Sequence, residues 1–186
     1  MALAGLGHNG GPTLESGGSW RRHCWSRARA DLLPTLPLEV LRTRVRRAAE
    51  LGLDYRTYAS VRAATGHDVV AFLFSSNALR VMPGQEMPAD RSERLGRIGA
   101  ERIGLAQGRL APEDLLAAAQ GLLAAAHPAP RPFAGWSEQR HLLRAALGRI
   151  PSDRVILVGE GWLEREWSQA ARFAACLEAD RYMRAG

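Results

Sequence analysis

Proline and glycine divide this chain of 186 residues into segments about as long as ordinary helices. In residues 38–51, for instance, Leu38, Leu41 and Val45 fall at helical spacing on one face, and Pro37 stands at the first turn. Most of the other segments also have the length and composition of helices. The pattern predicts a mainly α-helical protein of several helices, with one or two short strands in its C-terminal part.

Two short apolar runs are the candidates for strands. Residues 154–159, RVILVG, form the stronger one. Residues 69–74 could form a buried strand, but Asp68 as a cap and an apolar pattern that continues to Val81 favour a buried helix over 68–81. The remaining helices are expected at 20–33, 38–51, 55–64, 91–108, 112–126, 136–147 and 162–184.

Composition divides the chain into four parts. Residues 1–18 are rich in glycine and lack periodicity, which predicts a flexible tail. Residues 19–82 are expected to form a basic helical module. Residues 83–91 contain proline and glycine and are the expected linker, and residues 92–186 are expected to form a helical C-terminal part with a candidate strand at 154–159.

The chain contains no lysine, so all 25 of its basic side chains are arginine. A lysine nucleophile, a phosphate-loop lysine and a kinase-type lysine are therefore excluded, which argues against several classes of enzyme. Ten of the arginines fall within residues 20–65, where four acidic residues oppose them. Such a concentration suits an anionic partner, although a solvated helical face gives the same count.

Residues 44–63, RVRRAAELGLDYRTYASVRA, resemble a DNA-binding helix-turn-helix. Ala48 supplies the small residue that two crossing helices need, and Gly52, four residues later, suits a left-handed turn. The residues that would plug the turn, cap the second helix and face inward from it are Leu51, Leu53, Asp54, Tyr58 and Val61.

The resemblance implies a DNA-binding, regulator-like protein in which residues 55–64 are the recognition helix. Arg56, near the start of that helix, could form a bidentate pair with guanine, and neighbouring arginines would contact phosphates. The DNA-binding residues predicted in this way are Arg42, Arg44, Arg46, Arg47, Tyr55, Arg56, Ser60 and Arg62.

Two residues depart from the helix-turn-helix pattern. Arg47 stands where an apolar residue is usual, and Asp54 places a negative charge at the end that would approach DNA. An ordinary helical hairpin joined at Gly52 explains the same residues. The alternative function is therefore a helical protein–protein interaction or accessory role without catalytic activity, in which the basic face meets an acidic protein partner.

A third hypothesis is a catalytic or phosphate-binding site. If residues 69–74 and 154–159 were parallel neighbours in a sheet, Ser75, Ser76, Asn77 and Glu160 would meet at their carboxyl ends. However, the chain has no G-x-G-x-x-G, no G-x-S-x-G and no phosphate-loop lysine, and two strands are too few for such a sheet. Catalysis at this edge is therefore not favoured.

Cysteine usage and hydropathy bear on the cellular compartment. Cys24 and Cys176 are the only cysteines and lie far apart, so a reduced, cytoplasmic protein is expected. No segment approaches the ~18 apolar residues of a membrane span. Neither a metal nor a cofactor is predicted, and the sequence does not specify an oligomeric state.

Overall fold

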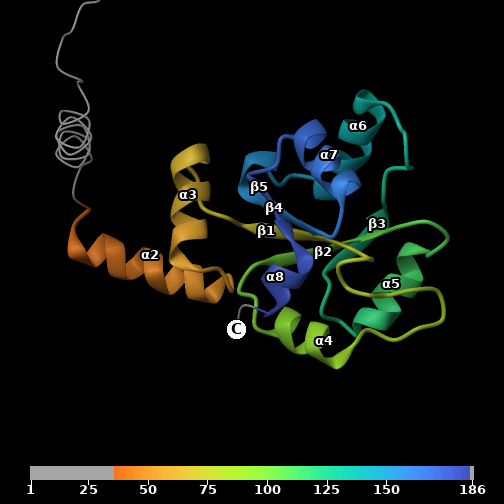
Figure 1. Cartoon of the computed structure of the whole chain (residues 1–186), viewed down its shortest axis with the longest axis horizontal. Coiled ribbons are helices and arrows are strands. Elements are labelled where there is room, and N and C mark those ends of the chain that lie inside the picture. Colours follow the sequence, from red (N-terminus) through yellow and green to blue (C-terminus); the bar gives the residue numbers. More distant parts are fainter. Residues whose placement is uncertain (1–35, 185–186) are drawn as a thin grey trace, which may run out of the picture. The chain divides into compact units, whose positions relative to one another are not determined.

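The computed structural model describes residues 36–184 (Figure 1). The chain divides into two units, residues 1–40 and 41–186. Of the first unit, residues 36–40 are described; all are exposed, and they include the first residues of helix α2 (Leu38–Glu50). The predicted tail at 1–18 and the predicted helix at 20–33 lie outside the described residues.

A parallel sheet of five strands forms the centre of the second unit (Figure 1). Its strands are β1 (Ala71–Ser75), β2 (Glu101–Ala106), β3 (Ala125–Pro128), β4 (Val155–Gly159) and β5 (Ala175–Glu178). Their order across the sheet is β3-β2-β1-β4-β5, and every neighbouring pair is parallel. The protein is therefore α/β, and the prediction of a mainly α-helical protein is wrong.

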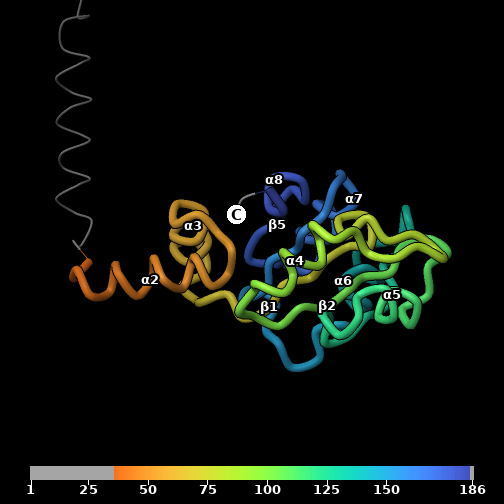
Figure 2. Tube along the Cα trace, turned by 90° about the horizontal axis from the view of Figure 1, so that it is seen from below, coloured from red at the N-terminus to blue at the C-terminus, as the bar shows by residue number. Residues whose placement is uncertain are grey.

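Helices cover both faces of the sheet. One face packs against α3 (Tyr55–Thr65), α4 (Ala89–Gly96), α5 (Pro112–Ala119) and α8 (Ala179–Arg184), and the other packs against α6 (Trp136–Leu147) and α7 (Trp162–Ala171). Along β1, Phe72 and Phe74 join the first layer, whereas Ala71 and Leu73 join the second. In Figure 2, turned by 90°, α3 lies toward the left of the second unit and α5 toward the right.

The chain winds outward from β1 in two directions. The segments from β1 to β3 build one half of the sheet, and β4 and β5 build the other half on the far side of β1. A right-handed crossover on each half then places the connecting helices on opposite faces. The sheet is doubly wound, and its topological switch point lies between β1 and β4.

The strands β1, β2, β3 and β5 were not predicted as such. Most of the apolar run at 69–74 lies in β1 rather than in a helix over 68–81, and the helices predicted at 91–108, 112–126 and 162–184 each end early and are followed by a strand. Burial on both faces removes the alternation that marks a strand. In addition, β3 (AAHP) and β5 (ACLE) lack the β-branched residues that favour strands.

Other elements agree with the sequence. The predicted helices at 38–51, 55–64 and 136–147 correspond to α2, α3 and α6, and the predicted strand at 154–159 corresponds to β4. Their bounds differ from the prediction by at most one residue. Of the predicted linker at 83–91, residues 83–88 lie in the connection between β1 and α4, and residues 89–91 begin α4, all within the second unit.

Distant segments bond the end of α2 to the rest of the second unit. The last carbonyls of a helix have no partner within it and need donors from elsewhere. Three donors from distant segments reach the end of α2. One of them, the Arg94 guanidinium, also lies over the Tyr182 ring, 4.9 Å from its centroid. The bonds are from Gly99 N to Glu50 O (2.7 Å), from the Tyr182 hydroxyl to Leu51 O (2.8 Å) and from Arg94 Nη2 to Gly52 O (2.5 Å).

We expect Gly52→Ala to destabilise the protein more than Gly66→Ala. Both glycines have positive φ, +64° and +76°, so each substitution costs about 1 kcal/mol of backbone strain. A Cβ at Gly52 would also lie 2.7 Å from Arg94 Nη2, whereas nothing lies within 4 Å of one at Gly66. Displacing the buried guanidinium adds ~1–3 kcal/mol. Urea unfolding measures the loss in free energy of unfolding for each variant, and equal losses would contradict the role given to Arg94.

Candidate functional site

The turn between α2 and α3 has the geometry that the sequence predicts. Gly52 adopts the left-handed conformation, and Asp54 caps α3 by accepting a hydrogen bond from Thr57 N at 2.9 Å. Ala48, Tyr58 and Val61 are buried in the same core cluster. A helix-turn-helix and an ordinary helical hairpin share this geometry, so it does not separate the two hypotheses.

Arg47 and Arg62, which are both predicted DNA-binding residues, pair with Asp68 within the fold. Arg47 Nε donates to Asp68 Oδ2 at 3.0 Å, and its two other nitrogens donate to the carbonyls of Gly99 and Val69, both at 3.0 Å. Arg62 Nη1 lies 4.0 Å from the other oxygen of Asp68. Arg47 departs from the helix-turn-helix pattern, and it joins the hairpin to the segments that precede β1 and β2.

The other predicted DNA-binding residues are distributed over both helices. Arg42, Arg46, Arg56 and Ser60 are exposed, and Arg44 and Tyr55 are half-buried. Their spacing places Arg42 and Arg46 on one face of α2, and Arg56 and Ser60 on one face of α3. Asp54, which precedes α3, is exposed as well.

A second group of polar residues lies at the carboxyl ends of β1, β2 and β4. Since β1 and β4 are parallel neighbours, Ser75 to Asn77 do lie at the same edge as Glu160. The chain of bonds there runs from Asn77 N to Gln107 Oε1 (3.2 Å), from Gln107 N to Ser76 Oγ (3.1 Å), from Gln107 Nε2 to Glu164 Oε1 (3.4 Å) and from Gly161 N to Glu164 Oε2 (3.1 Å). These bonds link the three strand ends into one network.

Burial distinguishes this network from polar side chains on the surface. Ser75, Ser76 and Glu164 are 0%, 2% and 2% exposed. The Glu164 carboxylate folds back over the end of β4, where a Cβ at Gly159 would lie only 2.4 Å from Glu164 Cβ. A glycine at position 159 therefore makes room for a buried acid at the topological switch point.

The two serines lack the surroundings of an activated nucleophile. Ser75 Oγ accepts from Ala78 N at 3.1 Å, and Ser76 Oγ accepts from Gln107 N. Within residues 36–184, no hydrogen bond joins either serine to a histidine. Both serine hydroxyls are thus occupied as acceptors of backbone hydrogen bonds.

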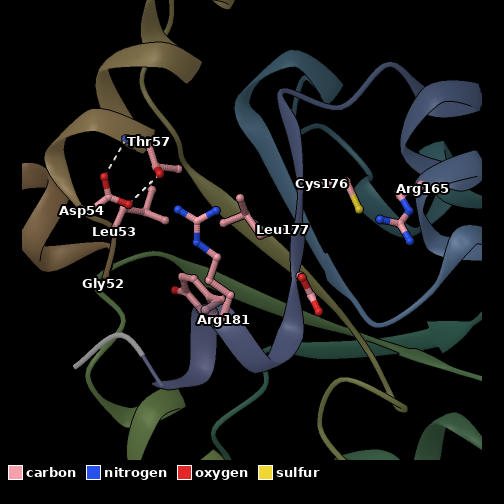
Figure 3. A pocket seen from close by; sticks show the side chains of 10 residues that line it. Gly52, Leu53, Asp54, Thr57, Arg165, Cys176, Leu177 and Arg181 are labelled. Carbon is pink, nitrogen blue, oxygen red and sulfur yellow. Dashed lines mark hydrogen bonds between the residues drawn. The ribbon is translucent and has the colours of Figure 1, made fainter.

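A cleft of about 250 Å³ runs along the outer side of β5 (Figure 3). Figure 3 shows Leu177 and Cys176 on opposite sides of the strand, with Arg181 on the Leu177 side and Arg165 on the Cys176 side. The cleft adjoins a smaller pocket at residues 159–161, with which it shares four lining residues. Its lining residues are Gly52, Leu53, Asp54, Thr57, Arg165, Cys176, Leu177, Glu178, Arg181 and Tyr182.

The charges in the cleft balance. Arg165 and Arg181 face Asp54 and Glu178, so neither sign predominates. Asp54 already accepts hydrogen bonds from the Thr57 hydroxyl and amide, and these bonds lower the pKa of its carboxyl below the usual value. The cleft is therefore not a basic surface.

Sequence reasoning named Ser75, Ser76, Asn77 and Glu160 but missed Gln107 and Glu164. Gln107 follows β2, which was not predicted as a strand. Glu164, by contrast, has a local signal. A glutamate at the third position of a helix completes a capping box with the residue that precedes the helix. The spacing of Gly161 and Glu164 matches that box, and the bond between them is its second half.

We expect the Cys176 thiol to react slowly. Burial, and secondly the Glu164 carboxylate, raise the pKa of Cys176 to about 11. In a Cys24→Ser variant, alkylation by iodoacetamide at pH 8 is expected to be about 100-fold slower than that of an ordinary thiol, because each pKa unit removes tenfold of the thiolate. Adding Glu164→Gln should speed the reaction. An ordinary rate in the folded protein would contradict the assigned burial.

Neither membrane-spanning helices, nor a metal cluster, nor similarity to known proteins indicates a function for the described residues. None of the helices in residues 36–184 is long and apolar enough to cross a membrane. The same residues contain no group of three or more His, Cys, Asp or Glu side chains that could hold a metal ion. No family model, no curated protein and no solved structure matches the chain.

Proposed function

We propose that this protein binds a small ligand at the carboxyl edge of its sheet, where β1, β2 and β4 end. In doubly wound sheets, ligands bind in the crevice outside the carboxyl ends of the strands at the topological switch point. The order β3-β2-β1-β4-β5 has its switch between β1 and β4. The fold thus supports the location of a ligand site, and the side chains at that location support ligand binding there.

The buried Glu164 network is the observation that carries the proposal. Burying a carboxylate is unfavourable unless hydrogen bonds compensate it. Glu164 is 2% exposed and bonds to Gly161 and Gln107, so the fold holds a charge at the switch point in a fixed position. Asn77 and Glu160 adjoin the network and are exposed, so a ligand can reach them.

The charges at this edge favour a ligand without a phosphate group. A helix N-terminus normally offers free amides to an anion. At the start of α7, however, the Gly161 amide already donates to Glu164, and Glu160 adds a second carboxylate beside it. A neutral or positively charged ligand that donates hydrogen bonds suits this edge better than a phosphate ester.

A matched pair of ligands tests the proposal. Calorimetric titration and thermal shift should detect binding of at least one compound among adenosine, cytidine, glucose and free amino acids. For a compound that binds, the phosphate ester should bind about tenfold or more weakly, since like charges at close range repel. AMP and glucose 6-phosphate are the matched esters. Glu160→Gln should narrow the difference in affinity between a compound and its phosphate ester, and Asn77→Ala should weaken binding of both.

Glu101→Gln is the control for that titration. Glu101 is exposed and begins β2 at the opposite end of the strands, so its substitution should leave binding unchanged. Preference for the phosphate ester, or absence of binding by every compound, would contradict the proposal.

The α2–α3 hairpin supports nucleic-acid binding as a second candidate function. The observation that favours it is that Tyr58 and Val61 pack inward with Ala48, while Arg56 and Ser60 remain exposed on one face of α3. A recognition helix needs this division between an inner apolar face and an outer polar face.

Titration with duplex DNA of random sequence tests the second candidate. Affinity should fall steeply between about 50 and 200 mM salt, because each neutralised phosphate releases counterions. A double change of Arg44 and Arg56 to alanine should weaken binding, whereas Arg97→Ala, at the exposed residue that follows α4, should not. Binding that is absent or insensitive to salt would rule this function out, and binding to polyglutamate alone would point to the acidic protein partner instead.

A further inference from the structure

We propose that Phe133 and Trp162 form a stacking surface for a planar, unphosphorylated ring compound of the nucleoside class; this inference rests on the ligand site proposed above. Phe133 lies in the connection after β3, and Trp162 is the first residue of α7, directly after the turn that follows β4. Both therefore lie at the carboxyl edge of the sheet. Trp162 immediately follows Gly161, which bonds to the buried Glu164.

The two rings touch each other but are otherwise open to solvent. Phe133 is 89% exposed and Trp162 is 59% exposed. Their centroids are 6.2 Å apart and their planes are inclined by 43°, which is a typical aromatic contact. An aromatic side chain stabilises a fold chiefly through the area that it buries, and Phe133 buries little.

The backbone at Phe133 is unfavourable as well. Its φ is +63°, the left-handed region that bulky residues rarely adopt. Strain of this kind persists only where the surroundings impose it, and it concentrates at functional sites. Neither burial nor backbone preference therefore explains a phenylalanine at this position.

The surrounding residues hold Phe133 in this conformation. Pro130 and Pro132 restrict the chain before it, and Ala134 N closes a turn onto Arg131 O at 3.1 Å. Gln139, which is fully buried, donates to Ala134 O at 2.8 Å and to Glu166 Oε1 of α7 at 2.8 Å. The loop is thus fixed against α7, and the ring is presented beside Trp162 before any ligand arrives.

An exposed pair of aromatic rings at a ligand-binding edge matches the face of another planar ring. Stacking of a base on an aromatic side chain tolerates different bases, because every base has a π-face. The carboxylates of Glu160 and Glu164 next to Trp162 disfavour a phosphate, so a nucleoside fits this surface better than a nucleotide does.

The first part of the test is thermal stability and needs no ligand. Phe133→Gly should raise the unfolding midpoint by about 2–4 °C, because glycine adopts positive φ without strain. Phe133→Ala should give no such gain, because it removes the ring but keeps the strain. Gln120→Gly is the matched control, since Gln120 also has positive φ (+48°) and is exposed. A lower midpoint for Phe133→Gly would mean that the ring serves the fold and would overturn the inference.

The second part is binding, followed by quenching of tryptophan fluorescence with adenosine, guanosine and cytidine. At least one nucleoside should quench saturably, and the quench should be lost in Trp162→Phe. Phe133→Gly and Phe133→Ala should both weaken binding about tenfold or more. Gln120→Gly should bind like the original protein, although its stability rises.

The outcomes separate this inference from the ligand site on which it rests. If a compound binds and Asn77→Ala weakens it, but both Phe133 variants bind normally, the carboxyl-edge site stands and the stacking surface is wrong. The stacking surface is equally wrong if only sugars or amino acids bind. If no compound binds, both proposals are wrong.

Discussion

The central strand β1 is the element on which the rest of the structure depends. It pairs with β2 on one edge and β4 on the other, and each of its five residues is fully buried. Phe72 and Phe74 anchor one helical layer, and Ala71 and Leu73 anchor the other. The polar network begins directly after this strand, at Ser76, so the same strand builds the core and sets the position of the proposed ligand site.

The residues of the α2–α3 hairpin do not support its two interpretations, a DNA-binding helix-turn-helix and an ordinary helical hairpin, equally. Its turn has the inward and outward faces of a helix-turn-helix, yet Arg47 bonds to Asp68 and to two backbone carbonyls, and Arg62 approaches the same carboxylate. A guanidinium held in this way loses much of its value for phosphate contact. The departure of Arg47 from the motif was therefore a sign of its role in the fold.

The sequence predicted elements whose signals are local and missed those whose signals are not. Helices α2, α3 and α6 have helical periodicity and clear breaks, so their bounds are correct to within one residue. Strand β2 contains Gly104, which weakens its strand pattern but is needed because a Cβ there would lie 2.7 Å from Leu115 Cδ2. Pairing of β1 with β4 depends on residues more than eighty positions apart, which no local pattern reports. The candidate site was accordingly predicted only on the condition that this pairing occurs.

The bond between the Tyr182 hydroxyl and Leu51 O has a consequence for folding during synthesis. The two residues are 131 positions apart, so α2 and α3 leave the ribosome long before Tyr182 does. Until then, the Leu51 carbonyl at the end of α2 lacks this donor and is hydrated. Strand β1 likewise waits for β4 on one of its edges. Contacts of such long range make folding slow, and they place completion of the bonds at the end of α2 among its last steps.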